Sequence, residues 1–175
     1  MDSSSAPADP PSPGDRLVSA STVVDAPPSV VFSILADPRQ HQRIDGSGSL
    51  RGMVTGPDRL RATGDRFGVA MRLFGVPYRI SNTVVELEPD RRIAWRHFGA
   101  HRWRYELHPT PERRTRVTET WDASRYRPAA FRLLALAGFP ARNRRGIAAT
   151  LERLKAAAEA AGAGESDARP EPSGS

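Results

Sequence analysis

The chain has 175 residues, no Cys, and a formal net charge of +6 from 26 Lys and Arg against 20 Asp and Glu. The absence of Cys excludes disulfides, a thiol nucleophile and Cys-ligated zinc or iron–sulfur clusters. It favours a reducing compartment, and because the N-terminus has no basic and apolar signal segment, we expect a cytoplasmic protein. The longest apolar stretch, residues 128–140, is shorter than the roughly 20 residues that a membrane-spanning helix needs.

The composition predicts one folded domain between two disordered tails. Residues 1–15 and 162–175 are rich in Ser, Pro, Ala, Gly and acidic residues, and they cannot bury enough apolar surface to offset the entropy of ordering. The domain therefore spans residues 16–161. The tails hold six acidic residues and one basic residue, so 25 basic and 14 acidic residues remain and give the domain a charge of +11.

The order of predicted elements starts with a strand over residues 17–24, where β-branched residues alternate with others. Pro27 and Pro28 favour the start of a helix that runs to Leu35, and a second short helical turn extends to about Ile44. The Gly-rich stretch 46–48 is expected to be a hinge. Six further strands lie between turns rich in Gly, Pro or charge, at residues 49–55, 65–73, 78–88, 92–98, 101–107 and 115–122.

The C-terminal region returns to helix. A short apolar helix is predicted over 128–138, with Pro140 as an interruption, followed by a long helix over 141–161. The apolar stripe that includes Ile147 and Leu151 would face the sheet. The whole pattern is α+β: a seven-stranded curved antiparallel sheet, with two short helices after strand 1, wrapped on a long C-terminal helix. A space between sheet and helix would suit a ligand, with Ile147 and Leu151 on its helix side.

Strand alternation assigns one face of the sheet to the cavity. A three-residue turn at 98–100 would pair His97 with His101 and would place Ile93 on the same face. The residues predicted to line the cavity from the sheet are Phe67, Met71, Ile80, Asn82, Trp95, Trp103, Tyr105, Glu119 and Trp121. The opposite face is rich in Arg, and we expect it to be a solvated surface.

Polar residues interrupt this apolar face, and Glu119 is the most informative of them. Burial would raise the pKa of its carboxyl, as a ligand-orienting or acid/base group requires. A structural network with Tyr105, a histidine or an Arg is the alternative. Candidate catalytic residues are Glu119, His97 and Tyr105, although His97 and His101 are expected at the rim. No metal site is expected, because hairpin pairing does not converge three ligands, and no cofactor is indicated.

The partners implied by charge and apolar surface are limited. The basic residues are dispersed and form no recognised nucleic-acid-binding motif, so specific nucleic-acid binding is not expected. The apolar segment Phe131–Phe139 could pack in the core, cover the cavity or make transient membrane contact. The sequence leaves the oligomeric state open.

Four stretches also resemble a known family. The opening 23–38, the break at 45–48, the strand 92–95 and the stretch 116–121 are similar to the SRPBCC superfamily of START-like helix-grip proteins, of the polyketide cyclase/dehydrase and lipid transport type. The resemblance covers about residues 16–160. It implies a deep hydrophobic cavity between the sheet and the terminal helix, without implying one activity.

Three functions are compatible with these features. The first is binding of a hydrophobic small molecule, lipid or polyketide-like, in the cavity. The second is a polyketide cyclase or dehydratase that uses Glu119 with His97 or Tyr105 as acid and base. The third is a regulatory interaction protein that uses its basic surface.

Overall fold

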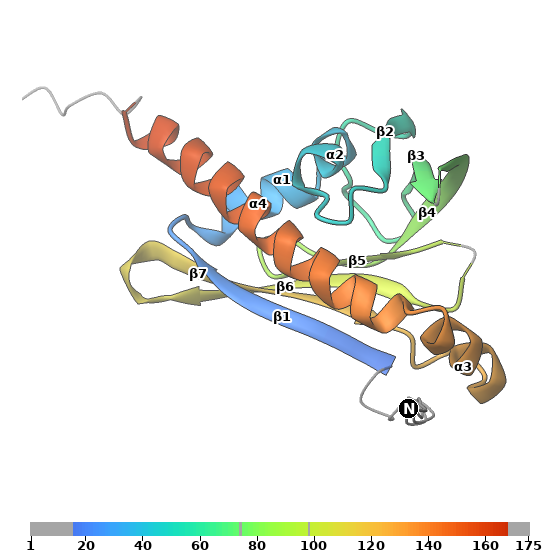
Figure 1. The fold of residues 1–175 in the computed structure, drawn as a ribbon. Coiled ribbons are helices and arrows are strands. Elements are labelled where there is room, and N and C mark those ends of the chain that lie inside the picture. Colours follow the sequence, from blue (N-terminus) through green and yellow to red (C-terminus); the bar gives the residue numbers. More distant parts are fainter. Residues whose placement is uncertain (1–15, 74, 98, 168–175) are drawn as a thin grey trace, which may run out of the picture.

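In a computed structural model, the chain forms one strongly curved antiparallel sheet with helices on its concave side (Figure 1). The structure describes residues 16–73, 75–97 and 99–167. Seven strands run in the order β1-β7-β6-β5-β4-β3-β2 across the sheet. Their bounds are β1 (Leu17–Val24), β2 (Leu50–Thr55), β3 (Arg66–Leu73), β4 (Val76–Glu88), β5 (Arg92–Arg96), β6 (Arg102–Thr110) and β7 (Arg114–Asp122).

Two short helical segments follow β1, as predicted. Helix α1 (Pro28–Leu35) has proline in its first turn, where a missing backbone N–H costs no intrahelical hydrogen bond. The 3-10 turn η2 (Pro38–Gln40) and helix α2 (His41–Ile44) come next, with Asp37 accepting a hydrogen bond from the Arg39 backbone N–H. A second 3-10 turn, η3 (Pro111–Arg113), links β6 to β7.

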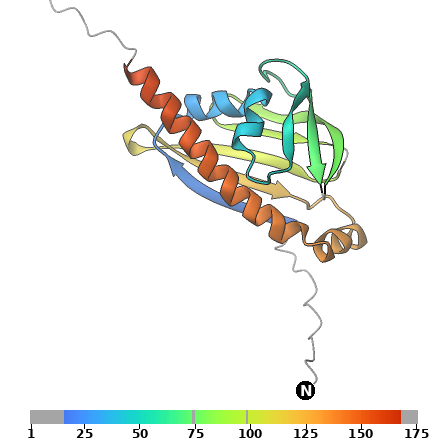
Figure 2. The same ribbon diagram turned by 45° about the horizontal axis from the view of Figure 1, so that its top comes forward.

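The long helix α4 (Phe139–Asp167) lies across the concave side of the sheet (Figures 1 and 2). Its apolar stripe is fully buried, because Ile147, Leu151 and Leu154 are at most 2% exposed. The predicted helix-grip architecture is therefore confirmed. Within the described ranges, no helix combines the length and the apolar character that crossing a bilayer requires.

The C-terminal helices differ in detail from the prediction. Helix α3 (Pro128–Leu136) is separated from α4 by Gly138, whose φ of 77° ends the first helix, whereas Pro140 sits inside the first turn of α4. Helix α4 also continues past Ala161 to Asp167, so residues 162–167 are helical. The remaining residues of the two predicted tails, 1–15 and 168–175, lie outside the described residues.

Gly46 is a point of close packing, which corrects its interpretation as a hinge. A Cβ added there would lie 2.3 Å from the Thr150 backbone nitrogen and 2.4 Å from the Gly146 carbonyl oxygen of α4. The Gly46 N–H donates to Thr150 Oγ1 at 2.9 Å. The Asp45 carboxylate accepts hydrogen bonds from the backbone N–H groups of the same loop, including that of Leu50 at 2.9 Å. Only glycine allows the loop to approach α4 this closely.

A bulge in β4 changes which of its residues face the cavity side. Val84 pairs with Trp95, but Glu86 pairs with Ala94, so one residue is unmatched between them. Beyond the bulge, Leu87 packs against the core while Glu86 lies on the convex face. Strict alternation along β4 fails at this point.

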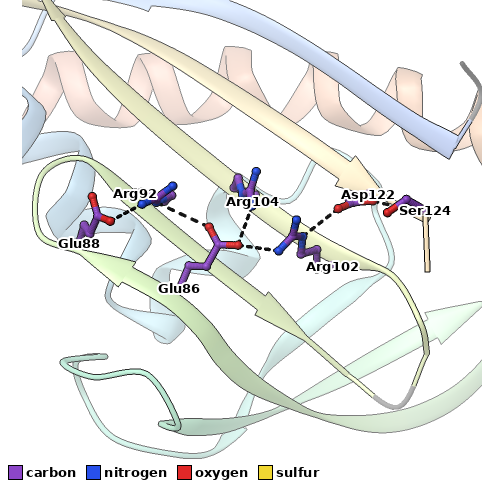
Figure 3. Close-up of polar contacts among 7 residues, drawn as sticks. All are labelled: Glu86, Glu88, Arg92, Arg102, Arg104, Asp122 and Ser124. Carbon is purple, nitrogen blue, oxygen red and sulfur yellow. Dashed lines mark hydrogen bonds and ion pairs between the residues drawn. The ribbon is translucent and has the colours of Figure 1, made fainter.

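The convex face carries an ion-pair network, where the sequence predicted a simple solvated surface (Figure 3). Glu86 Oε1 accepts hydrogen bonds from Arg102 Nη1 and Arg104 Nη2, both at 2.6 Å. Arg102 Nε also donates to Asp122 Oδ2 at 2.9 Å. These side chains are only 9 to 24% exposed, and Ala94 is fully buried, so this part of the convex face is partly shielded from water.

Candidate functional site

A cavity of about 400 Å³ lies between the concave face of the sheet and the helices. Its wall includes aromatic rings in contact with one another. The Trp95 ring is 5.7 Å from Phe67 and 5.5 Å from Tyr105, measured between ring centroids. All three Trp residues of the chain line the cavity: Trp95, Trp103 and Trp121.

The structure brings together every lining residue that was predicted from the sheet. Strand pairing places Trp95 opposite Trp103, as the predicted hairpin register required, and the pairing of β6 with β7 places Tyr105 opposite Glu119. His97 also lines the cavity. The full set of predicted residues in the wall is Phe67, Met71, Ile80, Asn82, Trp95, His97, Trp103, Tyr105, Glu119 and Trp121. Their role in binding a ligand stays a prediction.

The two predicted lining residues of α4 are placed elsewhere. Ile147 and Leu151 pack into the hydrophobic core and do not line the cavity. A neighbouring face of the same helix lines it instead, through Phe139, Arg142, Asn143, Gly146 and Thr150. These positions have helical spacing, but they include both polar and apolar residues. Apolar periodicity therefore does not identify this face of the helix.

Glu119 faces the cavity from β7 and is only 3% exposed. Burial raises the pKa of its carboxyl to about 8, while hydrogen bonding with Tyr105 acts in the opposite direction and the negative charge of Asp45 raises it further. Its Oε2 atom is buried and has no hydrogen-bond partner among the described residues. At neutral pH this group is therefore mostly a carboxylic acid, with polar capacity that the described protein atoms do not use.

Two more polar groups lie in the same wall. Tyr105 is buried, and burial together with the Glu119 carboxyl raises the pKa of its phenol well above the ordinary value. Asn82 on β4 is 3% exposed. With Glu119, these residues place a small set of polar atoms inside an otherwise apolar wall.

His41 is a lining residue that the sequence analysis missed. Its Nε2 donates to the Leu35 carbonyl at 2.8 Å, and its ring stacks on Trp95 with centroids 4.9 Å apart. The bond satisfies a carbonyl at the end of α1, and burial lowers the pKa of the imidazole. Because α2 has only four residues, it shows no periodic pattern from which this contact could have been predicted.

A histidine pair lies at the β5–β6 turn. The rings of His97 and His101 are 4.4 Å apart in an edge-on arrangement, and His101 Nδ1 is 2.8 Å from the Tyr126 hydroxyl. Burial and the neighbouring His97 lower the pKa of His101 to about 4. Burial also lowers the pKa of His97. Both rings are therefore neutral at physiological pH.

Arg142 supplies positive charge to another part of the wall. It donates from Nη2 to Ser49 Oγ at 3.0 Å, and its charge lowers the pKa of Tyr78 against the larger effect of burial, which raises it. Tyr78 is 36% exposed, so this part of the wall meets solvent. No group of three His, Asp or Glu side chains within residues 16–73, 75–97 and 99–167 could hold a metal ion.

Comparison with protein families gives one match that spans most of the chain. Residues 16–159 match the family described as polyketide cyclase / dehydrase and lipid transport. A relative in Mycobacterium tuberculosis, the uncharacterized protein Rv0088, is 41% identical over 143 residues. That alignment covers 81% of this chain and 63% of the relative, so the chain spans less than two thirds of the length of this curated relative.

Solved structures share the fold at low sequence identity. Protein NE0264 from Nitrosomonas europaea has a TM-score of 0.63 at 19% identity, over 85% of this chain and 97% of that one. Protein Ms6760 from Mycobacterium smegmatis has a TM-score of 0.60 at 18% identity, over 81% and 92%. At these identities the similarity establishes the architecture alone.

Proposed function

Because the chain belongs to the polyketide cyclase / dehydrase and lipid transport family, we propose that it binds a hydrophobic small molecule, lipid or polyketide-like, in the cavity between its sheet and α4. The observation that carries the proposal is the aromatic cavity of about 400 Å³. This volume lies in the range of about 300–1,000 Å³ typical of small-molecule sites.

The polar groups of the wall suggest how such a ligand would be oriented. Glu119 is mostly protonated at neutral pH and can donate a hydrogen bond, and its Oε2 lacks a partner among the described residues. A ligand with a carbonyl or hydroxyl oxygen on an apolar skeleton would pair with this group. Asn82 and Tyr105 would offer further hydrogen bonds in the same wall.

Binding is tested with the uncharged fluorescent probe N-phenyl-1-naphthylamine. We expect saturable probe fluorescence and a parallel change in Trp emission, because all three Trp residues line the cavity. Ile80→Phe should narrow the cavity and weaken binding at least about tenfold, or about 1.4 kcal/mol. The matched control is Val54→Phe, since Val54 is exposed on β2 and outside the cavity. Equal affinity of the two folded variants would refute binding in this cavity.

The natural ligand is sought by mass spectrometry of organic extracts of the purified protein. A copurifying molecule with an apolar skeleton and few polar oxygens is expected. The extract of Ile80→Phe should contain less of it than the extract of Val54→Phe. Equal recovery from both would show that the molecule is carried outside the cavity.

Acid/base catalysis on such a ligand is a second candidate, favoured by the pairing of Glu119 with Tyr105 across β6 and β7. A carboxyl with a pKa of about 8 can donate and accept a proton near neutral pH. His97 is less well placed as its partner, because it follows the last residue of β5 and lies four residues from Ile93, the residue paired with Tyr105. That separation corresponds to about 13 Å of extended strand.

The catalytic candidate is tested by incubating the protein with a short poly-β-ketone thioester and following cyclised or dehydrated products. Glu119→Gln should retain binding of N-phenyl-1-naphthylamine and lose turnover, whereas His97→Gln should retain both. Binding without turnover in the unmodified protein would leave ligand binding as the function and exclude catalysis on this substrate class.

A further inference from the structure

Helix α3 presents an apolar surface to solvent. It is anchored by Phe131, which is 2% exposed and lies 4.7 Å below the Arg16 guanidinium. On its outer side, Leu133 and Leu136 are 70% and 78% exposed. Single exposed leucines are common, but two at i and i+3 lie on the same face of a helix and form a continuous apolar patch.

A second apolar edge lies at the same end of the molecule. At the start of β4, Val76 is 64% exposed and Tyr78 is 36% exposed. The end of the β3–β4 hairpin and α3 lie at the same end of the fold in both ribbon views (Figures 1 and 2). Tyr78 and Leu134 of α3 line the same cavity, so both apolar edges border it.

The segment that carries this apolar surface is basic. The 29 residues from 123 to 151 contain six Arg and no Asp or Glu. Arg125, Arg127, Arg132 and Arg145 are exposed and, within the described part of the chain, have no carboxylate at ion-pair distance. In the convex-face network, by contrast, Glu86 alone contacts three Arg side chains.

We propose that α3, the first turns of α4 and the start of β4 form a docking surface for an anionic lipid bilayer. Leu133 and Leu136 would enter the interfacial region while the neighbouring arginines meet lipid phosphates and acidic headgroups. The combination distinguishes a bilayer from a nucleic acid, because exposed leucines contribute nothing to phosphate binding.

This docking surface does not depend on the proposed ligand. If the cavity does carry a hydrophobic molecule, docking would bring the cavity wall at Tyr78 and Leu134 to the membrane. The molecule could then pass between bilayer and protein with little exposure to water.

The first test is sedimentation of the full chain with vesicles of phosphatidylcholine alone or with about 30 mol % phosphatidylglycerol. We expect binding to the anionic vesicles at least about tenfold stronger than to the neutral ones at low salt, and a loss of that preference at high salt. Equal binding to both vesicle types, or binding to neither, would overturn the proposal.

Two pairs of variants separate the apolar and the charged contributions. Leu133→Ser with Leu136→Ser should weaken binding to anionic vesicles at least about tenfold, while Val54→Ser, at an exposed residue of β2, should not. Arg127→Gln with Arg132→Gln should reduce the preference for phosphatidylglycerol. The matched control, Arg59→Gln with Arg91→Gln, removes the same charge from exposed sites elsewhere and should preserve it.

Circular dichroism and thermal melting establish that each variant is folded. N-phenyl-1-naphthylamine binding provides an independent readout, because the leucine variant leaves the cavity wall intact and should bind the probe like the wild type. Unchanged vesicle binding in the folded leucine variant would overturn the proposal. Full displacement of vesicles by an equal charge of duplex DNA would also overturn it, by showing a surface that recognises only polyanions.

Discussion

Glu119 and Glu86 belong to the same sheet but lie on opposite faces, and their carboxylates have different surroundings. On the convex face, Glu86 accepts hydrogen bonds from Arg102 and Arg104 at 2.6 Å (Figure 3). On the concave face, Glu119 has a buried Oε2 without a partner among the described residues, and the Asp45 charge nearby raises its pKa. The carboxylate with arginine partners supports the fold, whereas the one buried without a cationic partner among the described residues lowers stability and remains available to a ligand.

The largest expected effect comes from Glu119→Gln. The pKa of Glu119 rises from an ordinary 4.5 to about 8 on folding, so the stability it contributes is complete below pH 4.5 and falls as the pH rises to 8. At 1.36 kcal/mol per pKa unit, the wild type loses about 4 to 5 kcal/mol of unfolding free energy between the two pKa values. Urea unfolding at pH 5, 7 and 9 should show the variant increasingly more stable than the wild type. If the free energy of unfolding of the variant and the wild type changed with pH in parallel, the raised pKa of Glu119 would be contradicted. The control is Glu152→Gln, at an exposed site of α4, which should leave the pH dependence unchanged.

The same chemical change on the convex face should have the opposite sign. Glu86→Gln leaves Arg102 and Arg104 partly buried without their shared anion, and we expect a loss of about 2 kcal/mol at pH 7. Urea unfolding at pH 7 compares it directly with Glu119→Gln, which should be stabilising there. If both variants are destabilised equally, the contrast between the two faces does not hold.

His101 extends the comparison to a basic group on the cavity side. Burial and His97 lower the pKa of His101 from 6.5 to about 4, so its contribution to stability is present above pH 6.5 and is lost as the pH falls to 4. As the pH falls from 6.5 to 4, the free energy of unfolding of His101→Gln should rise by about 2 to 3 kcal/mol relative to that of the wild type, after allowance for the partly exposed ring. Urea unfolding at several pH values in this range measures the difference. The control is His108→Gln, at an exposed site of β6. If the difference in unfolding free energy between His101→Gln and the wild type stayed constant from pH 6.5 to 4, the lowered pKa of His101 would be contradicted.

The smallest effect is expected at the exposed edge of the convex network. Arg92 pairs with Glu88, and their side chains are 37% and 49% exposed. Solvent screens such a pair, so Arg92→Ala should shift the melting temperature by about 2 °C or less. A larger shift would mean that the network acts as one unit, in which case the double variant with Glu86→Gln would be strongly non-additive.

Strand alternation predicted the concave face well, because each side chain of a paired strand has only two possible directions. The hairpin register placed Trp95 opposite Trp103, and the structure confirms it. The bulge at Val84–Glu86 could not be predicted, since it leaves no sign in the residue pattern.

The helix side of the cavity was predicted less well. Apolar spacing identifies the face of α4 that packs in the core, including Ile147 and Leu151, while the cavity meets the adjacent mixed face at Asn143 and Thr150. Gly46 resembled a hinge because glycine serves both mobile turns and close contacts. Only the position of α4 in space distinguishes these two uses.

The contact of Gly46 with α4 also bears on how quickly a ligand could be exchanged. The loop and the helix backbone touch there, so the wall cannot open at that point without separating α4 from its own hydrogen-bonded neighbour. Entry and exit should therefore occur at the far end, beside Tyr78 and Leu134. Residence time would then depend on how often α3, anchored by Phe131, moves aside, as well as on how tightly Glu119 holds the bound molecule.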